Sequence, residues 1–122
     1  MIGSVMMRVS VVLLLIGMVA GMAMGIQQNF TLAPAHAHLN LVGGVLLFLF
    51  GLYYRLVPAA GNSTLARIQG SLHILGGLVL PAGIALTLLN NGAYFAAPAI
   101  GSAIVVVATL LFAVVLFRTE RT

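Results

Sequence analysis

The sequence predicts an all-α integral membrane protein built as a four-helix bundle. Of its 122 residues, 62% are hydrophobic and only 5% are charged, and the mean hydropathy is +1.23, which is too apolar for a soluble domain of this size. Four apolar runs, each long enough to cross a bilayer, are separated by short polar breaks. Because unpaired backbone polar groups are costly in lipid, each run is expected to be an α-helix.

The expected spans cover roughly residues 5–26, 33–57, 65–89 and 96–117. The connections between them are too short for a separate soluble domain, so the whole chain, residues 1–122, is expected to form one transmembrane domain. Cysteine is absent, and disulfides therefore contribute nothing to the fold.

The first run is interpreted as a mature helix. An arginine followed by an apolar stretch that ends in small residues near Gly25 is also typical of a secretory signal, but this run is longer than a usual signal core. The segment GMVAGMAMG places Gly17, Gly21 and Gly25 four residues apart. Small residues at this spacing let membrane helices approach closely, so this face is expected to pack against another helix.

The boundaries of the later spans agree with local chemistry. Pro34 suits the first turn of the second helix, where its missing N–H costs nothing, and Ser63 or Thr64 can cap the third helix. The motif NNG at 90–92 is expected to close the third helix, and Pro98 to open the fourth.

The arginines predict the orientation of the chain. By the positive-inside rule, both termini and the 58–64 loop are expected on the cytoplasmic side of a bacterial inner membrane, and the uncharged loops at 27–32 and 90–95 on the outer side. The net charge of +4 therefore reports topology, and nucleic-acid binding is not expected because no basic cluster or aromatic platform supports it. All five arginines fall on the predicted inner side: Arg8, Arg55, Arg67, Arg118 and Arg121.

Two histidines stand at the start of the second span, in the segment APAHAHLNLVGG. At 100° per residue, His36 and His38 point about 200° apart yet differ by only about 3 Å in depth. A histidine inside a membrane is costly and suggests a functional site, and neutral imidazole is the commonest metal ligand. The alternative is that both lie at the outer interface, hydrated or bonded to backbone carbonyls.

The third histidine, His73, is expected to serve another purpose. Its depth differs from that of His38 by roughly 10 to 15 Å, so the two should not share one iron. We expect His73 to be a polar group bonded across the bundle. Three tyrosines at helix ends, Tyr53, Tyr54 and Tyr94, are expected to be interfacial anchors.

Two pairs of adjacent glycines, Gly43/Gly44 and Gly76/Gly77, do not fit a single contact stripe, because neighbouring residues point about 100° apart. We expect them to clear space for a flat, bulky ligand. A porphyrin with two axial imidazoles needs both at one level, and within one chain His36 points away from His38. The simplest solution is a second copy, with His38 of one protomer facing His36 of its neighbour.

The segment AHAHLNLVGGVLLFLFGLYYRLVP resembles the tenth transmembrane helix of haem-copper (cytochrome c) oxidase subunit I, in which a His-x-His pair opens a helix ending in aromatic residues and a proline. It also resembles that subunit's second helix, which begins Ala-His-Ala. In the family, the first histidine of the pair binds the high-spin haem and the second the low-spin haem. The resemblance implies haem b as cofactor and His36 and His38 as metal ligands; we predict Asn40, Gly43 and Gly44 as further cofactor-binding residues.

The family's subunit has twelve helices in three arcs of four around a pseudo-threefold axis, and this chain resembles one such arc. The resemblance implies a homotrimer in the lipid bilayer with a haem at each interface, although a dimer could pair the same histidines. Polar side chains in the outer loops are the best placed to reach haem propionates: Gln27, Gln28, Asn29, Thr31, Asn90 and Asn91.

The sequence departs from the family where oxygen chemistry is concerned. The copper site requires a His-His pair and a further histidine, whereas SLHILGG supplies only His73, and the one acid is Glu120 in the tail. Bis-imidazole ligation also leaves no open iron position. Electron transfer or haem handling is therefore expected rather than oxygen reduction with proton pumping, with the redox partner left open.

Two other classes of function stay open. A small oligomeric transporter or channel would use the oligomer axis as a pathway lined by His73 or Asn40, although no membrane-embedded carboxylate supports proton coupling. A cofactor-free assembly partner of larger respiratory complexes would explain the glycine-rich faces.

Overall fold

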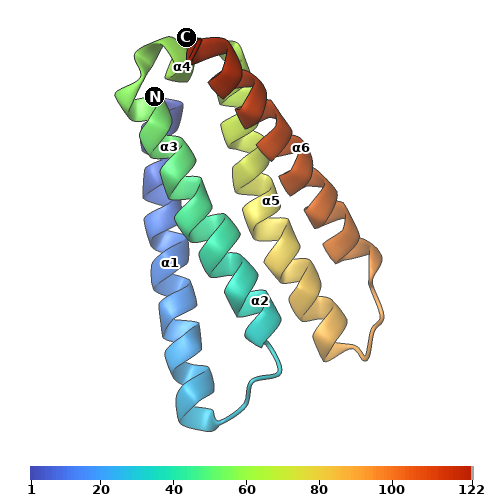
Figure 1. Cartoon of the computed structure of the whole chain (residues 1–122). Coiled ribbons are helices and arrows are strands. Elements are labelled where there is room, and N and C mark those ends of the chain that lie inside the picture. The colour runs from blue at the N-terminus through green and yellow to red at the C-terminus, as the bar shows by residue number, and fades with distance from the viewer. Residues whose placement is uncertain (122) are drawn as a thin grey trace.

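The computed structural model describes residues 1–121 and contains four long helices that run up and down, with both chain ends at the same end of the bundle (Figure 1). The second span is one continuous helix made of three segments, α2, η1 and α3. The elements in order are α1 (Ile2–Gln27), α2 (Ala33–His38), η1 (Leu39–Leu46), α3 (Leu47–Leu56), α4 (Pro58–Gly61), α5 (Thr64–Leu89) and α6 (Ala96–Thr119). The structure confirms the predicted all-α fold with four helices that are long and apolar enough to span a membrane.

The four spans are long and apolar enough to cross a membrane, and most of their surface is unburied. Within the most apolar 18-residue stretch of each span, only 17% to 33% of residues are buried inside the chain. Large side chains such as Leu15, Val19 and Leu110 are more than half exposed. In a membrane protein this surface faces lipid, which matches the composition of the chain.

The helix ends largely follow the predicted chemistry. The Ser63 hydroxyl caps α5 by accepting a hydrogen bond from the Ala66 amide at 3.1 Å. Gly92 has φ +89°, and its amide donates to the Thr87 carbonyl at 2.9 Å, which closes α5 as the NNG motif predicts. The left-handed cap of α1 at Gln28, φ 51°, was not predicted, because glutamine is not a usual residue there.

The middle of the second span is π-helical over Leu39–Leu46, directly after the histidine pair. The sequence predicts one uniform α-helix over 33–57, so the π-helical segment was not predicted. π-Helical stretches are rare and are often found at functional sites. The carbonyl of Val42, inside this segment, accepts a hydrogen bond from Nε2 of His73 on α5 at 2.9 Å. The π segment therefore supplies an acceptor to a neighbouring helix.

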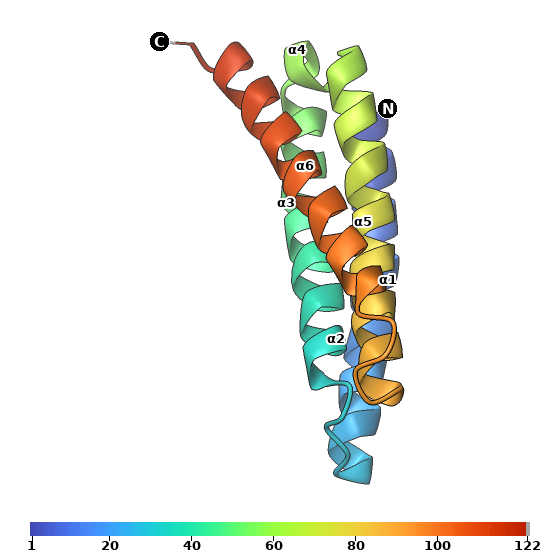
Figure 2. The ribbon, with the colours of Figure 1, turned by 90° about the vertical axis from the view of Figure 1, so that its right-hand side faces the viewer.

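Glycines set the spacing between the helices. A Cβ added to Gly51 of α3 would lie 2.9 Å from the Gly3 carbonyl oxygen of α1, and one added to Gly101 of α6 would lie 2.6 Å from Cα of Leu80 in α5. These close approaches join α1 to the second span and α6 to α5. Figure 2 shows α6 crossing α5 and diverging from it toward the C-terminus.

Within one chain the glycine pairs face neighbouring helices rather than open space. A Cβ on Gly43 would lie 3.1 Å from the Gly77 carbonyl oxygen, and one on Gly44 would lie 2.5 Å from Leu14 of α1. Gly76 meets α6, whereas Gly77 meets Gly43. In each pair, one glycine contacts one neighbouring helix and the next glycine contacts another. Two adjacent small residues are therefore needed, because η1 and α5 each lie between two other helices.

Candidate functional site

His38 presents a free ring nitrogen at the surface of the second span. Its Nδ1 lies 2.7 Å from the carbonyl oxygen of Pro34, four residues earlier, and its side chain is exposed. A carbonyl oxygen only accepts, so in the neutral ring Nδ1 carries the proton and Nε2 carries a lone pair. A histidine that ligates a metal through one nitrogen usually donates from the other in this way.

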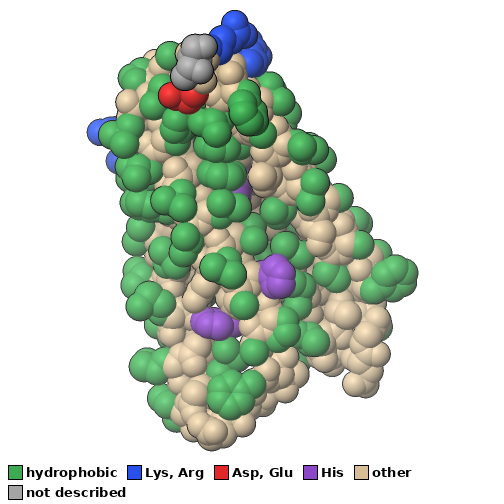
Figure 3. Space-filling model, in the orientation of Figure 1, with side chains coloured by type: hydrophobic (Ala, Val, Ile, Leu, Met, Phe, Trp, Pro, Cys, Tyr) green, Lys and Arg blue, Asp and Glu red, His purple; other side chains and the backbone are tan. Residues whose placement is uncertain are grey.

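His36 points toward α1 instead. A Cβ on Gly21 would lie 2.8 Å from Cε1 of His36 and 3.1 Å from its Nε2, so the imidazole ring occupies the space that the missing side chain leaves. Its Nδ1 is buried and has no hydrogen-bond partner among residues 1–121. The two histidines therefore leave the helix in different directions, as their spacing predicts. Figure 3 shows histidine side chains at the surface of this face of the molecule.

Asn40 follows the same pattern as His36, one helical turn further along. Its Oδ1 meets Gly17 of α1 and has no partner within the described chain. The glycine stripe of α1 thus packs against polar side chains of the second span. Asn40 packs against Gly17, and His36 packs against Gly21. Gly25 has no atom within 4 Å of an added Cβ, so the stripe is used over two of its three glycines.

His73 is bonded across the bundle, as predicted. It has no exposed surface, and its Nε2 donates to the Val42 carbonyl. Phe50 of α3 meets the His73 ring edge-on, with the ring centres 5.2 Å apart. Nδ1 of His73 has no hydrogen-bond partner within the part of the chain that the structure describes. The same is true of the side-chain amide nitrogen of Gln69, one turn earlier on α5. His73 is thus part of the packed interior, separate from the histidine pair.

One of the tyrosine predictions is wrong. Tyr54 is only 3% exposed and donates a hydrogen bond to Oε1 of the buried Gln69 at 2.8 Å, so it is a core residue rather than an interfacial anchor. The partner explains the difference, because Gln69 lies on α5 facing α3 and gives the phenol hydroxyl an acceptor inside the bundle. Tyr94, in contrast, is 62% exposed in the α5–α6 loop.

The outer-loop residues predicted to reach propionates make short local contacts in the single chain. The Gln28 amide donates to the Gly25 carbonyl at 2.7 Å, and the Asn90 amide to the Leu86 carbonyl at 2.7 Å. Asn29 Oδ1 accepts from both the amide and the hydroxyl of Thr31. The structure therefore orders these side chains against their own loops.

An apolar cavity of about 530 Å³ lies beside His36, between α1, the second span and α5. Its walls are almost entirely hydrocarbon, with His36 and Gln27 as the polar side chains. Among residues 1–121, no three side chains of His, Cys, Asp or Glu gather at one place. The candidate site of a single chain therefore consists of two histidines facing different surroundings, one exposed and one beside the cavity.

These residues fit a haem in part. His38 has the free Nε2 and the Nδ1–H donor contact that axial ligation requires. His36 has no partner for Nδ1 among residues 1–121, but its ring packs against Gly21 of its own α1 beside the apolar cavity and is not presented at the surface as His38 is. Comparison of the chain with known protein families, curated proteins and solved structures finds no match.

Proposed function

We propose that this chain is a membrane haem b-binding protein in which His36 and His38 are axial ligands, resembling one four-helix arc of oxidase subunit I. The observation that carries the proposal is the His38 ring, whose Nδ1 is held by Pro34 and whose Nε2 is free at an exposed surface. A bis-imidazole haem supplies a one-electron couple with no open iron position, which suits electron transfer or haem handling.

Two copies are needed for this site. In one chain His36 faces α1 while His38 is exposed, so the pair cannot clasp one iron from both sides. His38 of one protomer and His36 of the next supply one ligand each, and three copies repeat the threefold arrangement of the oxidase arcs. The arginine pattern favours cytoplasmic termini in a bacterial inner membrane, which places the histidine pair toward the outer side.

The test is the absorbance spectrum of the detergent-purified protein, expressed with ample haem and measured oxidised and then reduced with dithionite. The wild-type protein should show the sharp reduced α-band of a low-spin b-type haem. His38→Ala should lose that band while keeping its helical circular dichroism. Leu41→Ala, at a 62% exposed position on the same span, is the matched control and should keep it.

A colourless wild-type protein under these conditions would contradict the proposal and favour the transporter or assembly-partner alternatives. Ion or solute flux in liposomes separates those two, because a cofactor-free assembly partner conducts nothing. An unchanged spectrum in His38→Ala would remove that residue from the ligand set.

A further inference from the structure

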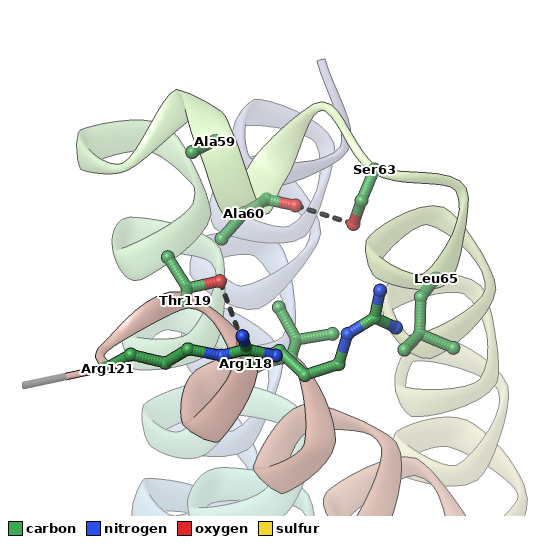
Figure 4. A pocket seen from close by; sticks show the side chains of 8 residues that line it. Ala59, Ala60, Ser63, Leu65, Arg118, Thr119 and Arg121 are labelled. Atoms are coloured by element: carbon green, nitrogen blue, oxygen red, sulfur yellow. Dashed lines mark hydrogen bonds between the residues drawn. The ribbon is translucent and has the colours of Figure 1, made fainter.

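A second cavity lies at the opposite end of the bundle from the histidine pair, where the chain termini are. It measures about 450 Å³ and is bounded by α4, the first turn of α5 and the last turn of α6. Figure 4 shows the side chains of Arg118 and Arg121 lying across it, with Arg118 reaching from α6 toward Leu65 of α5. Both arginine side chains thus line the same hollow.

No carboxylate side chain is among the described residues that line this cavity. Glu120 stands between the two arginines in sequence and is the only acid of the chain, but its carboxylate oxygen accepts a hydrogen bond from the Tyr53 hydroxyl at 2.6 Å. The acid is thereby turned toward α3. Among the residues that the structure describes, the cavity lining therefore carries net positive charge, and the positive dipole end of α5 at Leu65 adds to it.

The depth of the cavity indicates what could fill it. It lies where α5 begins and the second span and α6 end, which is the level of lipid headgroups whichever leaflet this end faces. Its walls combine the two arginines with the apolar side chains of Leu65 and Val115, and the last turns of α6 also carry exposed apolar side chains, Val114 at 45% and Phe117 at 75%. Charge beside hydrocarbon matches an amphiphile with a phosphate head.

We propose that this cavity binds the phosphate group of an anionic membrane phospholipid, with Arg118 and Arg121 as its charged donors. Arginine suits this role because its planar fork can donate two hydrogen bonds to phosphate oxygens. Basic pockets between transmembrane helices at a membrane surface are typical of such lipid sites. Because no carboxylate side chain among the described lining residues can pair with a choline or ethanolamine, headgroups with a net negative charge are preferred.

The test is native mass spectrometry of the full-length protein in micelles that contain equal amounts of phosphatidylglycerol and phosphatidylcholine with identical acyl chains. The wild-type protein should retain phosphatidylglycerol preferentially, roughly thirtyfold over phosphatidylcholine for two arginines near a surface. Arg118→Gln with Arg121→Gln should abolish the preference. The double variant Arg8→Gln with Arg55→Gln loses the same charge outside the cavity and should retain it.

A separate arm adds inorganic phosphate at millimolar concentration to distinguish a lipid from a free anion. Retention of phosphatidylglycerol in its presence supports the lipid site, whereas displacement of the lipid by phosphate would overturn it. Equal retention of both lipids by the wild-type protein, or an unchanged preference in the cavity variant, would also overturn the proposal. Circular dichroism of each variant checks its helix content, and Arg118→Lys, which keeps the charge but not the fork, should show an intermediate preference.

Discussion

The three histidines differ in what holds their rings, and these differences decide what each can do. His38 is bonded through Nδ1 to its own helix and His73 through Nε2 to another helix. His36 lies against a glycine, and its Nδ1 has no hydrogen-bond partner among residues 1–121. The same residue type thus supplies an exposed lone pair at His38, a crosslink at His73 and, at His36, a ring beside an apolar cavity.

These contacts predict opposite tautomers for two of the rings. Backbone carbonyls accept from Nδ1 of His38 and from Nε2 of His73, so the neutral rings should carry their protons on Nδ1 and Nε2 respectively. Nitrogen NMR of the apoprotein labelled at histidine, with His38→Ala and His73→Ala for assignment, measures this. Finding the same tautomer at both sites would contradict one of the two hydrogen bonds.

The buried crosslink predicts a stability effect. His73→Ala should lower the free energy of unfolding by about 2–4 kcal/mol, because it removes an interhelical hydrogen bond and leaves a cavity beside Phe50. Reversible unfolding in mixed detergent micelles, followed by circular dichroism, measures the change. Leu75→Ala on the same helix, 48% exposed, should change it by less than about 1 kcal/mol. If both substitutions lowered the free energy of unfolding by the same amount, the buried His73 hydrogen bond would contribute nothing to stability.

Sequence reasoning succeeded at residues whose surroundings are local or whose chemistry is distinctive. The Ser63 cap depends on residues three positions away, and a lone histidine deep in an apolar helix needs a partner wherever it is. Tyr54 was mispredicted because its partner, Gln69, lies on another helix, and no local pattern shows which helix faces which.

At the scale of the helices, some glycines are in close contact with a neighbouring helix and others are not. Gly51 and Gly3 bring the backbones of α3 and α1 together, whereas Gly25, near the other end of α1, meets nothing. The sequence shows the small residues but not which of them are in contact, because the GxxxG spacing of Gly17, Gly21 and Gly25 is regular throughout.

This difference gives a matched pair of variants. Gly51→Ala should destabilise the bundle by about 1–3 kcal/mol, because the new methyl group would lie 2.8 Å from Cβ of Met6 and the helices must separate. Gly25→Ala adds the same atom in open space and should be neutral or slightly stabilising, since alanine favours helix. Unfolding midpoints of the two variants provide the measurement, and indistinguishable midpoints would mean that α1 and α3 are not in backbone contact.

The π-helical segment is the element that sequence reasoning missed entirely. Its residues, LNLVGGVL, are ordinary for a membrane helix, and their composition gives no sign of the rare five-residue hydrogen-bond pattern. What distinguishes the segment is tertiary: Asn40 and Gly43 meet α1 and α5, and Val42 bonds to His73.

For the whole molecule, the fold class and the four spans followed from composition and hydropathy alone, because lipid allows few alternatives to apolar helices. Oligomer size and cofactor are different, since they depend on surfaces that one chain leaves exposed. The proposal of a haem shared between protomers therefore calls for a test made on the assembly.

Mixing two inactive variants provides that test. His36→Ala and His38→Ala should each lose the low-spin haem, whereas co-expressed and co-purified protomers should recover part of it. At a mixed interface, His38 of one variant faces His36 of the other, which restores one complete ligand pair. The reduced α-band per protein measures the recovery, and native mass should report three chains of 12.7 kDa each. No recovery, although the variants assemble together, would mean that both ligands come from one chain.

The contact between Gly43 and Gly77 has a consequence for motion. The α1–α3 and α5–α6 hairpins meet there almost backbone to backbone, with an added Cβ on Gly77 only 3.1 Å from Cα of Gly43. Neither residue has a side chain to interlock with its neighbour, so the contact resists separation more than rotation. The His73–Val42 and Tyr54–Gln69 hydrogen bonds join the same two hairpins, so these three contacts together set the angle between them. The apolar cavity beside His36, which both hairpins border, would widen or narrow with that angle.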